Sequence, residues 1–404
     1  MFAAKDKYLC HTAVFSTGER FPVLLYKGTY QPVILATRYV VDECRDNKKA
    51  GTISRDIRVL KWFYEWCGTS GVELEERLRT GKLLTKAEIT GFCRYLRSRR
   101  NELIVGSIGT TNHSTQDRLS ILSPETFNSY ISVIEAFLVW AAYEFTPVGT
   151  PENSIRETVA VSIQRIERSF RSVRQYGYTA NKRRGLSREE IENLRKVVKP
   201  GGENNPFKKT VQFRNHLIFE LLLATGIRRG ELLKIKIKHL PIASKTTLSI
   251  VRAPDDKEDP RRIEPQVKTR PRELPLPKPL CVDLWRYVQK YRMRGDSTYL
   301  LTSMRGGVAL GQGAVNFIFD HLTTRCIPYL KGRLSPHVLR HTFNELLLEE
   351  AMAYGLGEQQ IKELQRYLNG WSEHSEMPSL YTRRVIEKQA MEIAERYQAS
   401  LYVF

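Results

Sequence analysis

The chain has 404 residues, and its 64 lysines and arginines against 44 aspartates and glutamates give a formal net charge of +20. An excess of this size indicates a polyanionic partner, and nucleic acid is the first candidate. No run of about 18 apolar residues is present to cross a bilayer, and the N-terminal residues lack the apolar core of a signal peptide.

Six cysteines are scattered along the chain without a C-x-x-C pair, which is typical of reduced thiols rather than of disulfides or a zinc site. The phosphate-binding pattern G-x-x-x-x-G-K-S/T is absent, so the sequence gives no support for nucleotide hydrolysis. We therefore expect a soluble, intracellular protein that contacts DNA or RNA.

The first part of the chain is predicted to be an extended segment followed by helices. Over residues 1–35, apolar stretches on either side of Thr17-Gly18 predict a short hairpin. Residues 36–168 then follow a helical pattern and predict a helical DNA-binding domain. Its first long helix has an apolar stripe of Ile57, Leu60, Tyr64 and Cys67. Basic residues at other positions of that helix are candidates for DNA contact, namely Arg55, Arg58 and Lys61.

Two more helices are predicted in this domain. One lies near Lys86–Arg97, and one begins at Ser123-Pro124 and buries a stripe that includes Ile134 and Phe137. Between them, residues 101–122 are rich in Gly, Ser and Thr, which predicts a loop.

Residues 169–186 are predicted to be a basic linker between two domains, because arginine, lysine and glycine replace the large aliphatic residues. Lys182, Arg183 and Arg184 are its candidates for contact with a nucleic acid backbone. Ser187, with Glu190 three residues later, has the pattern of a capping box and marks the start of a second domain over 187–384.

The second domain then contains a strongly apolar helix that ends at Thr225-Gly226, and the turn after it holds Arg228. A new helix follows at Glu231. Further on, Ile263–Val267 and Arg272–Leu276 are predicted to pair as strands with Lys268 at the tip of their hairpin. The charged stretch 255–262 before them is predicted to be a surface loop, and 247–253 and 298–301 to be strands.

The last third of the domain predicts another group of polar residues. Ser335-Pro336 is a typical helix start, and it places His337 and Arg340 on one face of the first turns. A later helix ends at Asn369-Gly-Trp371, and Tyr381 follows.

These residue types suit phosphoryl transfer. Two arginines can neutralise the non-bridging oxygens of a phosphodiester, a lysine can protonate a leaving alkoxide, and a tyrosine can attack phosphorus. Taken singly, each has an ordinary structural alternative: Lys268 as a turn lysine, Trp371 as a packing aromatic and Tyr381 as a half-buried tyrosine.

The order of five motifs resembles the tyrosine recombinase/integrase family of phages and mobile elements. The motifs are Ala224–Leu232, Lys268, His337–Phe343, Leu368–Trp371 and Leu380–Thr382. The resemblance implies a mainly α fold with a small antiparallel β-sheet, in which a helical core-binding domain and a catalytic domain form a C-shaped clamp on DNA.

By this resemblance, Arg228 and Arg340 are the catalytic arginine pair. Lys268 is the general acid for the 5′-hydroxyl leaving group, His337 is the base for the tyrosine proton, and Tyr381 is the nucleophile.

Two further positions complete the site by resemblance, and two depart from the family pattern. Trp371 takes the place that is His or Trp in the family, and Glu231 orients the site. The interval from Trp371 to Tyr381 is ten residues, one more than is usual, which leaves His374 as an alternative to Trp371. Arg270 stands where the family often has glycine.

The resemblance implies site-specific cleavage and rejoining of double-stranded DNA through a 3′-phosphotyrosyl intermediate and a Holliday junction, without metal, ATP or another cofactor. It also implies a homo-tetramer on two DNA sites, association with the nucleoid in the cytoplasm, no membrane contact and room for an accessory DNA-bending or directionality factor. A type IB topoisomerase-like nicking-closing enzyme and a catalytically inactive DNA-binding relative are the alternatives. Residues 385–404 end in four apolar residues and are expected to form a helix and tail that dock on a neighbouring protomer.

Overall fold

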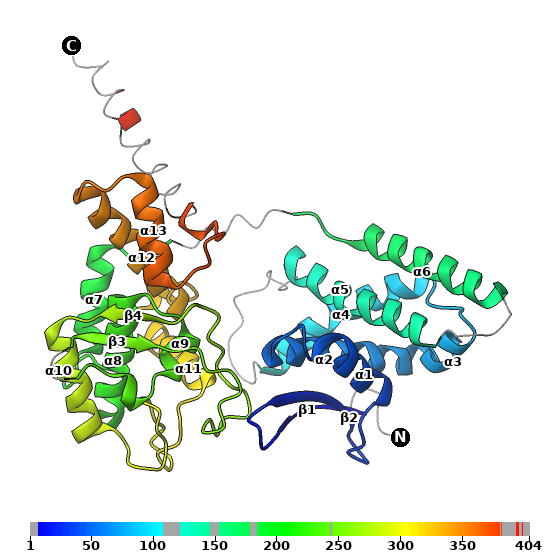
Figure 1. The fold of residues 1–404 in the computed structure, drawn as a ribbon, viewed down its shortest axis with the longest axis horizontal. Coiled ribbons are helices and arrows are strands. Elements are labelled where there is room, and N and C mark those ends of the chain that lie inside the picture. Colours follow the sequence, from blue (N-terminus) through cyan, green and yellow to red (C-terminus); the bar gives the residue numbers. More distant parts are fainter. Residues whose placement is uncertain are drawn as a thin grey trace. The chain divides into compact units, whose positions relative to one another are not determined.

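The chain forms two compact units, Met1–Ala180 and Asn181–Phe404, drawn in Figure 1. The computed structural model describes residues 7–107, 122–145, 153–177, 184–242, 245–379, 381, 393–395 and 398. Within these ranges no helix is long and apolar enough to span a membrane. The tail expected to dock in trans lies outside the described residues except for 393–395 and 398.

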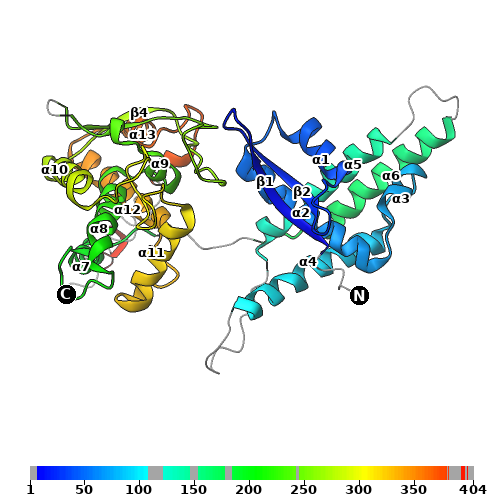
Figure 2. The same ribbon diagram turned by 90° about the horizontal axis from the view of Figure 1, so that it is seen from below.

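The first unit begins with the predicted hairpin. Strands β1 (Tyr8–Val14) and β2 (Arg20–Tyr26) pair antiparallel, in a register that runs from Tyr8 opposite Tyr26 to Val14 opposite Arg20. The hairpin packs on helix α2 (Ala50–Ser70), and Figure 2 shows the two strands beside this helix. Leu24 of β2 is fully buried in the same core as the α2 stripe.

The core of the first unit is built from helices around a group of aromatic rings. Phe63 of α2 meets Phe92 edge-on at a centroid distance of 5.3 Å and Phe137 at 6.3 Å. In the predicted α2 stripe Ile57, Leu60 and Cys67 are buried and Tyr64 is half-buried. The other helices are α1 (Ile34–Tyr39), a π-helical turn η2 (Val40–Cys44), α3 (Leu74–Arg79), α4 (Lys86–Ser107), α5 (Pro124–Glu144) and α6 (Asn153–Val173).

Two predicted boundaries in this unit are wrong. Helix α4 continues to Ser107, into the range expected to be a loop, because 97–105 contain no glycine or proline to end it. The rest of that expected loop, 108–121, lies outside the described residues. Helix α6 enters the expected linker and ends at Val173, because Ile163, Ile166 and Phe170 keep a buried helical spacing.

The second unit is built around helix α8 (Lys209–Thr225). Its apolar stripe, which includes Leu217 and Leu221, is fully buried, as predicted. Ser187 and Glu190 form the predicted capping box of α7. The other elements are α7 (Arg188–Val198), α9 (Arg229–Lys234), the 3-10 turn η3 (Ile237–His239), α10 (Lys278–Arg286), the π-helical turn η4 (Tyr287–Tyr291), α11 (Gln312–Arg325), the 3-10 turn η5 (Pro328–Leu330), α12 (Pro336–Ala353) and α13 (Glu358–Asn369).

The strand pairing in the second unit differs from the prediction. β4 (Arg272–Pro275) pairs antiparallel with β3 (Thr247–Ile250), so that Ile250 lies opposite Arg272. Residues 263–267 form no strand, because Glu264 is drawn inward to a buried ion pair with Lys234. The expected strand at 298–301 is reduced to an isolated bridge between Tyr299 and Lys236. The class is nevertheless as predicted, mainly helical with small antiparallel sheets.

Candidate active site

The carboxylate of Glu231 is the centre around which the predicted site residues meet. Glu231 lies in the first turn of α9 and is 1% exposed. Arg228 is the N-cap of this helix, and its backbone N–H donates to Glu231 Oε2 at 2.6 Å. Glu231 Oε2 also lies 3.9 Å from Arg340 Nη1. A single buried carboxylate therefore holds the backbone of Arg228 and lies beside the guanidinium group of Arg340.

Arg272, at the start of β4, is a site residue that the sequence analysis missed. Its buried guanidinium donates to Glu231 Oε1 at 2.8 Å, and its Nε donates to the Leu368 carbonyl at 2.7 Å. The Thr269 hydroxyl also donates to Glu231. Arg272 thus links three elements, α9, β4 and α13. The only available signal was a charged residue at the start of an apolar strand, which is too common to single out.

The charges in this cluster are unequal. The guanidinium groups of Arg272 and Arg340 lie 2.8 Å and 3.9 Å from the Glu231 carboxylate. The charge of Arg228 also acts on Arg340, so the cluster has an excess of positive charge. Burial alone would raise the pKa of Glu231, but the hydrogen bonds and charge of Arg272 outweigh it and hold that pKa below its usual value. Burial, and then the charge of Arg228, lower the pKa of Arg340 to about 9. A bound anion such as a phosphate would relieve this excess.

Arg340 is held by backbone carbonyls on both sides. Helix α12 begins as predicted, with Ser335 Oγ accepting the Val338 N–H at 3.3 Å. Arg340 then donates to the Gly226 carbonyl at 2.7 Å and to the Asn369 carbonyl at 3.2 Å. Gly226 has φ of 61°, and a Cβ atom there would lie 2.2 Å from the Phe343 ring, so only glycine fits this turn.

Trp371 and Tyr381 complete the buried side of the site. The Arg340 guanidinium lies 5.4 Å from the centre of the Trp371 ring. The Trp371 ring in turn stacks on Tyr381 with a centroid distance of 5.9 Å and an interplanar angle of 14°. Tyr381 is 1% exposed, so it is fully buried and not half-buried as in the ordinary structural alternative. His374 is exposed, so the geometry favours Trp371 over His374 as the sixth residue of the site.

The predicted base, His337, is exposed and contacts a second histidine one turn further along α12. The Nε2 atoms of His337 and His341 are 3.2 Å apart. His341 is 4% exposed, and its ring centre is 5.4 Å from that of Tyr381. His341 therefore connects the predicted base to the predicted nucleophile. In the sequence His341 lies within the motif His337–Phe343, and nothing in that motif indicates its role.

Lys268 lies on an irregular segment rather than at the tip of a hairpin. Its side chain is exposed, whereas its neighbours Val267 and Thr269 are buried. Thr269 contacts Glu231, which places the Lys268 backbone beside the arginine cluster. The backbone N–H of Arg270, where the family often has glycine, donates to the Gly370 carbonyl at 2.9 Å.

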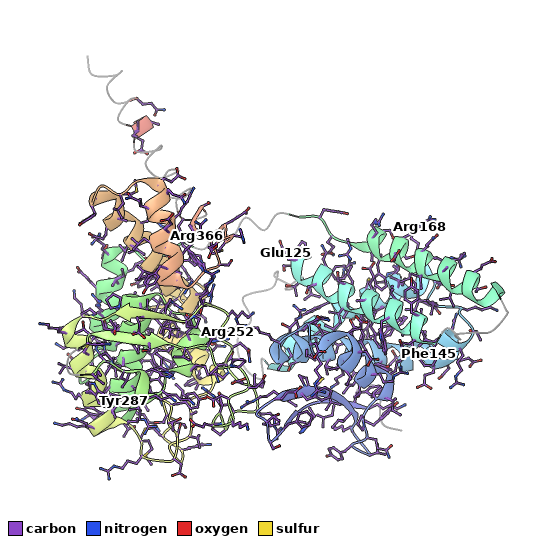
Figure 3. The ribbon with its side chains drawn as sticks, in the orientation of Figure 1. Glu125, Phe145, Arg168, Arg252, Tyr287 and Arg366 are labelled. Atoms are coloured by element: carbon purple, nitrogen blue, oxygen red, sulfur yellow. The ribbon has the colours of Figure 1, made fainter. Side chains whose placement is uncertain are left out.

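A groove of about 410 Å³ opens beside Trp371. Arg366, labelled in Figure 3, and Tyr367 of α13 line it together with Arg270 and Arg272. Two buried donors at its wall, Trp371 Nε1 and Arg366 Nε, have no acceptor among the residues that the structure describes.

The predicted DNA-contact residues are only partly described. On α2, Arg55 pairs with Asp56 at 2.8 Å and Lys61 with Glu65 at 3.6 Å, while Arg58 is exposed. In the linker Arg184 is exposed, and Lys182 and Arg183 lie outside the described ranges. Their contact with DNA stays a prediction.

Similarities to known proteins identify the family of the chain. Residues 184–385, half of the chain, match the model of the Phage integrase family. Tyrosine recombinase XerC of Anoxybacillus flavithermus is 30% identical over 152 residues, which are 36% of this chain and 45% of XerC. Tyrosine recombinase XerH of Campylobacter jejuni is 28% identical over 165 residues, 41% of each chain. The chain thus matches less than half the length of either relative.

Among solved structures, the pre-cleavage complex of XerH recombinase with difH substrate has a TM-score of 0.52 at 15% identity, covering 88% of this chain and 84% of XerH. The post-cleavage complex with palindromic difH has a TM-score of 0.50 at 16% identity, covering 90% and 87%. At these identities the likeness concerns the fold. With the family model matching from Arg184 past Tyr381, the chain belongs to the phage integrase family of tyrosine recombinases.

Proposed function

We propose that this protein is a site-specific recombinase that cleaves and rejoins double-stranded DNA, with Tyr381 as its nucleophile. One observation carries the proposal: the Trp371 ring lies between the Arg340 guanidinium at 5.4 Å and the Tyr381 ring at 5.9 Å. This packing holds a phenol next to an anion-binding arginine. Motif order alone matches both residues to the family.

The proposed cleavage step needs five side chains. The Tyr381 oxygen forms a bond to phosphorus as the bond from phosphorus to the 5′ oxygen breaks. His337 takes the proton of the phenol, and Lys268 gives a proton to the departing 5′ oxygen. Arg228 and Arg340 neutralise the charge on the non-bridging oxygens. The product is a 3′-phosphotyrosyl bond and a free 5′-hydroxyl.

Rejoining reverses these bond changes on a second duplex. The 5′-hydroxyl of the partner strand attacks the phosphotyrosyl bond, so the bond energy is conserved and the reaction needs no ATP. Exchange of one strand from each duplex gives a Holliday junction. We propose a homo-tetramer on two DNA sites, acting in the cytoplasm in association with the nucleoid.

A suicide substrate tests this function. The substrate carries a nick near the cleavage site, so cleavage releases a short strand that bears the 5′-hydroxyl. Without that strand the enzyme cannot rejoin the DNA, and it stays trapped as a covalent adduct that survives denaturing electrophoresis. We expect an adduct with a candidate recombination site, and we expect it to form in EDTA because arginines supply the charge that a metal would provide. Absence of an adduct on any site would favour the inactive relative, and loss of the adduct in EDTA would contradict the metal-free step.

Pairing two sites separates recombination from nicking and closing. A recombinase produces four-way junctions when two labelled sites are present, whereas a monomeric topoisomerase-like enzyme relaxes supercoils without exchanging strands. Junctions that carry both labels are the expected result. Relaxation without any junction would support the topoisomerase alternative.

A further inference from the structure

A buried network of ion pairs lies beside the arginine cluster, outside the set of residues proposed to react. Lys234 ends helix α9, and its side chain is 5% exposed. The ammonium group lies among three carboxylates, at 3.8 Å from Asp256, 3.4 Å from Asp259 and in closer contact with Glu264. These carboxylates come from 255–264, which the sequence predicts to be mainly a surface loop.

The network fixes the whole of this segment. The Tyr299 hydroxyl donates to Asp256 Oδ2 at 2.7 Å. Arg261 lies over the Tyr299 ring at 4.5 Å and donates to the carbonyls of Leu233 at 3.1 Å and Leu310 at 2.9 Å. Buried ions are costly to desolvate, and their bonds are directional. Each of these bonds holds the segment at one point, because a buried ion that loses its partner is strongly destabilising.

The segment then runs closely along α9 toward Lys268. Glu264 accepts the backbone N–H groups of Asp255 and Asp256, each at 3.1 Å. Two residues further on, the Gln266 carbonyl approaches α9 so closely that a Cβ atom at Gly230 would lie 2.3 Å from its oxygen. A glycine at position 230 therefore permits the close approach.

The other side of Lys268 is fixed as well. Thr269 donates to Glu231, and the Arg270 N–H donates to the Gly370 carbonyl at 2.9 Å. The backbone on both sides of Lys268 is thus tied to the helix that carries Glu231 and to the turn before Trp371, while the Lys268 side chain is exposed. The lysine side chain is flexible. The position of its backbone therefore sets the range of positions that its ammonium group can reach.

We infer that this ion-pair network positions Lys268 for proton donation to the leaving 5′ oxygen. Lys234, Glu264 and Tyr299 are positioning residues in this scheme, because they act through the backbone of Lys268. The inference rests on the proposed function. It adds that the charged segment, which resembles a solvated loop in sequence, is the support of the general acid.

A leaving-group comparison tests the inference. Cleavage is measured on an ordinary suicide substrate and on one with a 5′-bridging sulfur, which leaves without a proton. We expect Glu264→Gln to slow cleavage of the ordinary substrate about 10- to 100-fold, the scale of a small misplacement, and to stay within about threefold of the wild type on the sulfur substrate. Tyr299→Phe removes one hydrogen bond, so it should fold normally and show a smaller effect of the same selectivity.

Tyr287→Phe is the matched control. Tyr287, labelled in Figure 3, is a buried tyrosine of the same unit whose hydroxyl forms a hydrogen bond with Thr302. It should leave the ratio of the two cleavage rates unchanged. The inference is overturned if Glu264→Gln and Tyr299→Phe each slow cleavage of the two substrates by the same factor. It is also overturned if neither variant slows cleavage of either substrate. If the wild-type protein forms no adduct with either substrate, the proposed function itself fails.

Discussion

The side chain of Tyr381 is 1% exposed. Its hydroxyl oxygen is the proposed nucleophile, so cleavage requires it. Tyr381→Phe keeps the stacking on Trp371 and removes only the oxygen. We expect this variant to bind DNA within about twofold of the wild type, because the ring packing is unchanged, and to form no covalent adduct. Binding by gel shift and adducts on a suicide substrate measure the two properties.

Tyr367→Phe is the control for this substitution. Tyr367 is 59% exposed on α13, and its loss should leave adduct formation at the wild-type level. An adduct that persists in Tyr381→Phe would move the nucleophile elsewhere, with Tyr367 the first position to examine.

The proposed role of Lys268 as proton donor can also be tested with a single substitution. Lys268→Ala should cleave an ordinary phosphodiester about 10²–10⁴-fold more slowly, the usual range for loss of a general acid. Cleavage of the 5′-bridging sulfur substrate should be close to the wild-type rate. Lys278→Ala, at the start of α10, is a lysine control that should leave both rates unchanged. Equal defects of Lys268→Ala on both substrates would assign the proton to another group.

At the scale of elements, Arg272 joins α9, β4 and α13 through the buried Glu231 carboxylate and the Leu368 carbonyl. Arg272→Met should lower the free energy of unfolding by about 3–5 kcal/mol, because the buried Glu231 carboxylate loses its two guanidinium hydrogen bonds. Arg270→Met removes an exposed pair with Glu373 and should change it by less than about 1 kcal/mol. Chemical denaturation of both variants measures the difference.

This ion pair also makes stability depend on pH. The pKa of Glu231 is lowered in the folded state from an ordinary value of 4.5. Its contribution is therefore fully present above about pH 4.5 and is lost as pH falls through the folded-state pKa. The melting temperature of the wild type should fall over this acidic range more steeply than that of a Glu231→Gln/Arg272→Met variant. Parallel pH curves would show that Glu231 is not the titrating group.

What the sequence could predict at this scale depended on local signals. Ser335 with Pro336, Ser187 with Glu190 and the glycine stop at Gly226 each act within a turn, and all three helix boundaries are confirmed. Strand pairing is set by contacts far apart in the chain. β4 was placed correctly, but its partner is β3, some twenty residues earlier, because Glu264 is held by Lys234 and cannot take part in a hairpin.

The residues of the site also differ in whether local sequence signals predict them. Arg228, Arg340, Trp371 and Tyr381 belong to short motifs, and the structure brings them together around Glu231 and the stacked rings. Arg272 joins the cluster only through the fold, so no spacing in the sequence could reveal it.

At the scale of the whole molecule, the last twenty residues bear on assembly. We propose that 385–404 dock on a neighbouring protomer, because 401–404 are four consecutive apolar residues and each large one would gain about 1.5–3 kcal/mol on burial. Deleting 385–404 should leave binding to a single DNA site nearly intact and weaken the pairing of two sites. Gel shifts with one and two sites compare these steps, and normal pairing by the truncated protein, or its misfolding as a monomer, would refute docking in trans.

The two units have separate hydrophobic cores, one formed by residues between Tyr8 and Phe170 and the other beginning at Leu186. Heat should therefore unfold the chain in two calorimetric transitions rather than one. Phe137→Ala and Phe219→Ala each remove a fully buried ring, at a cost of about 3–5 kcal/mol, and each should lower the melting temperature of its own transition alone. At an intermediate temperature one unit would be unfolded and the other still folded. Cleavage would then be lost with the unit that unfolds first, while the second unit keeps its structure.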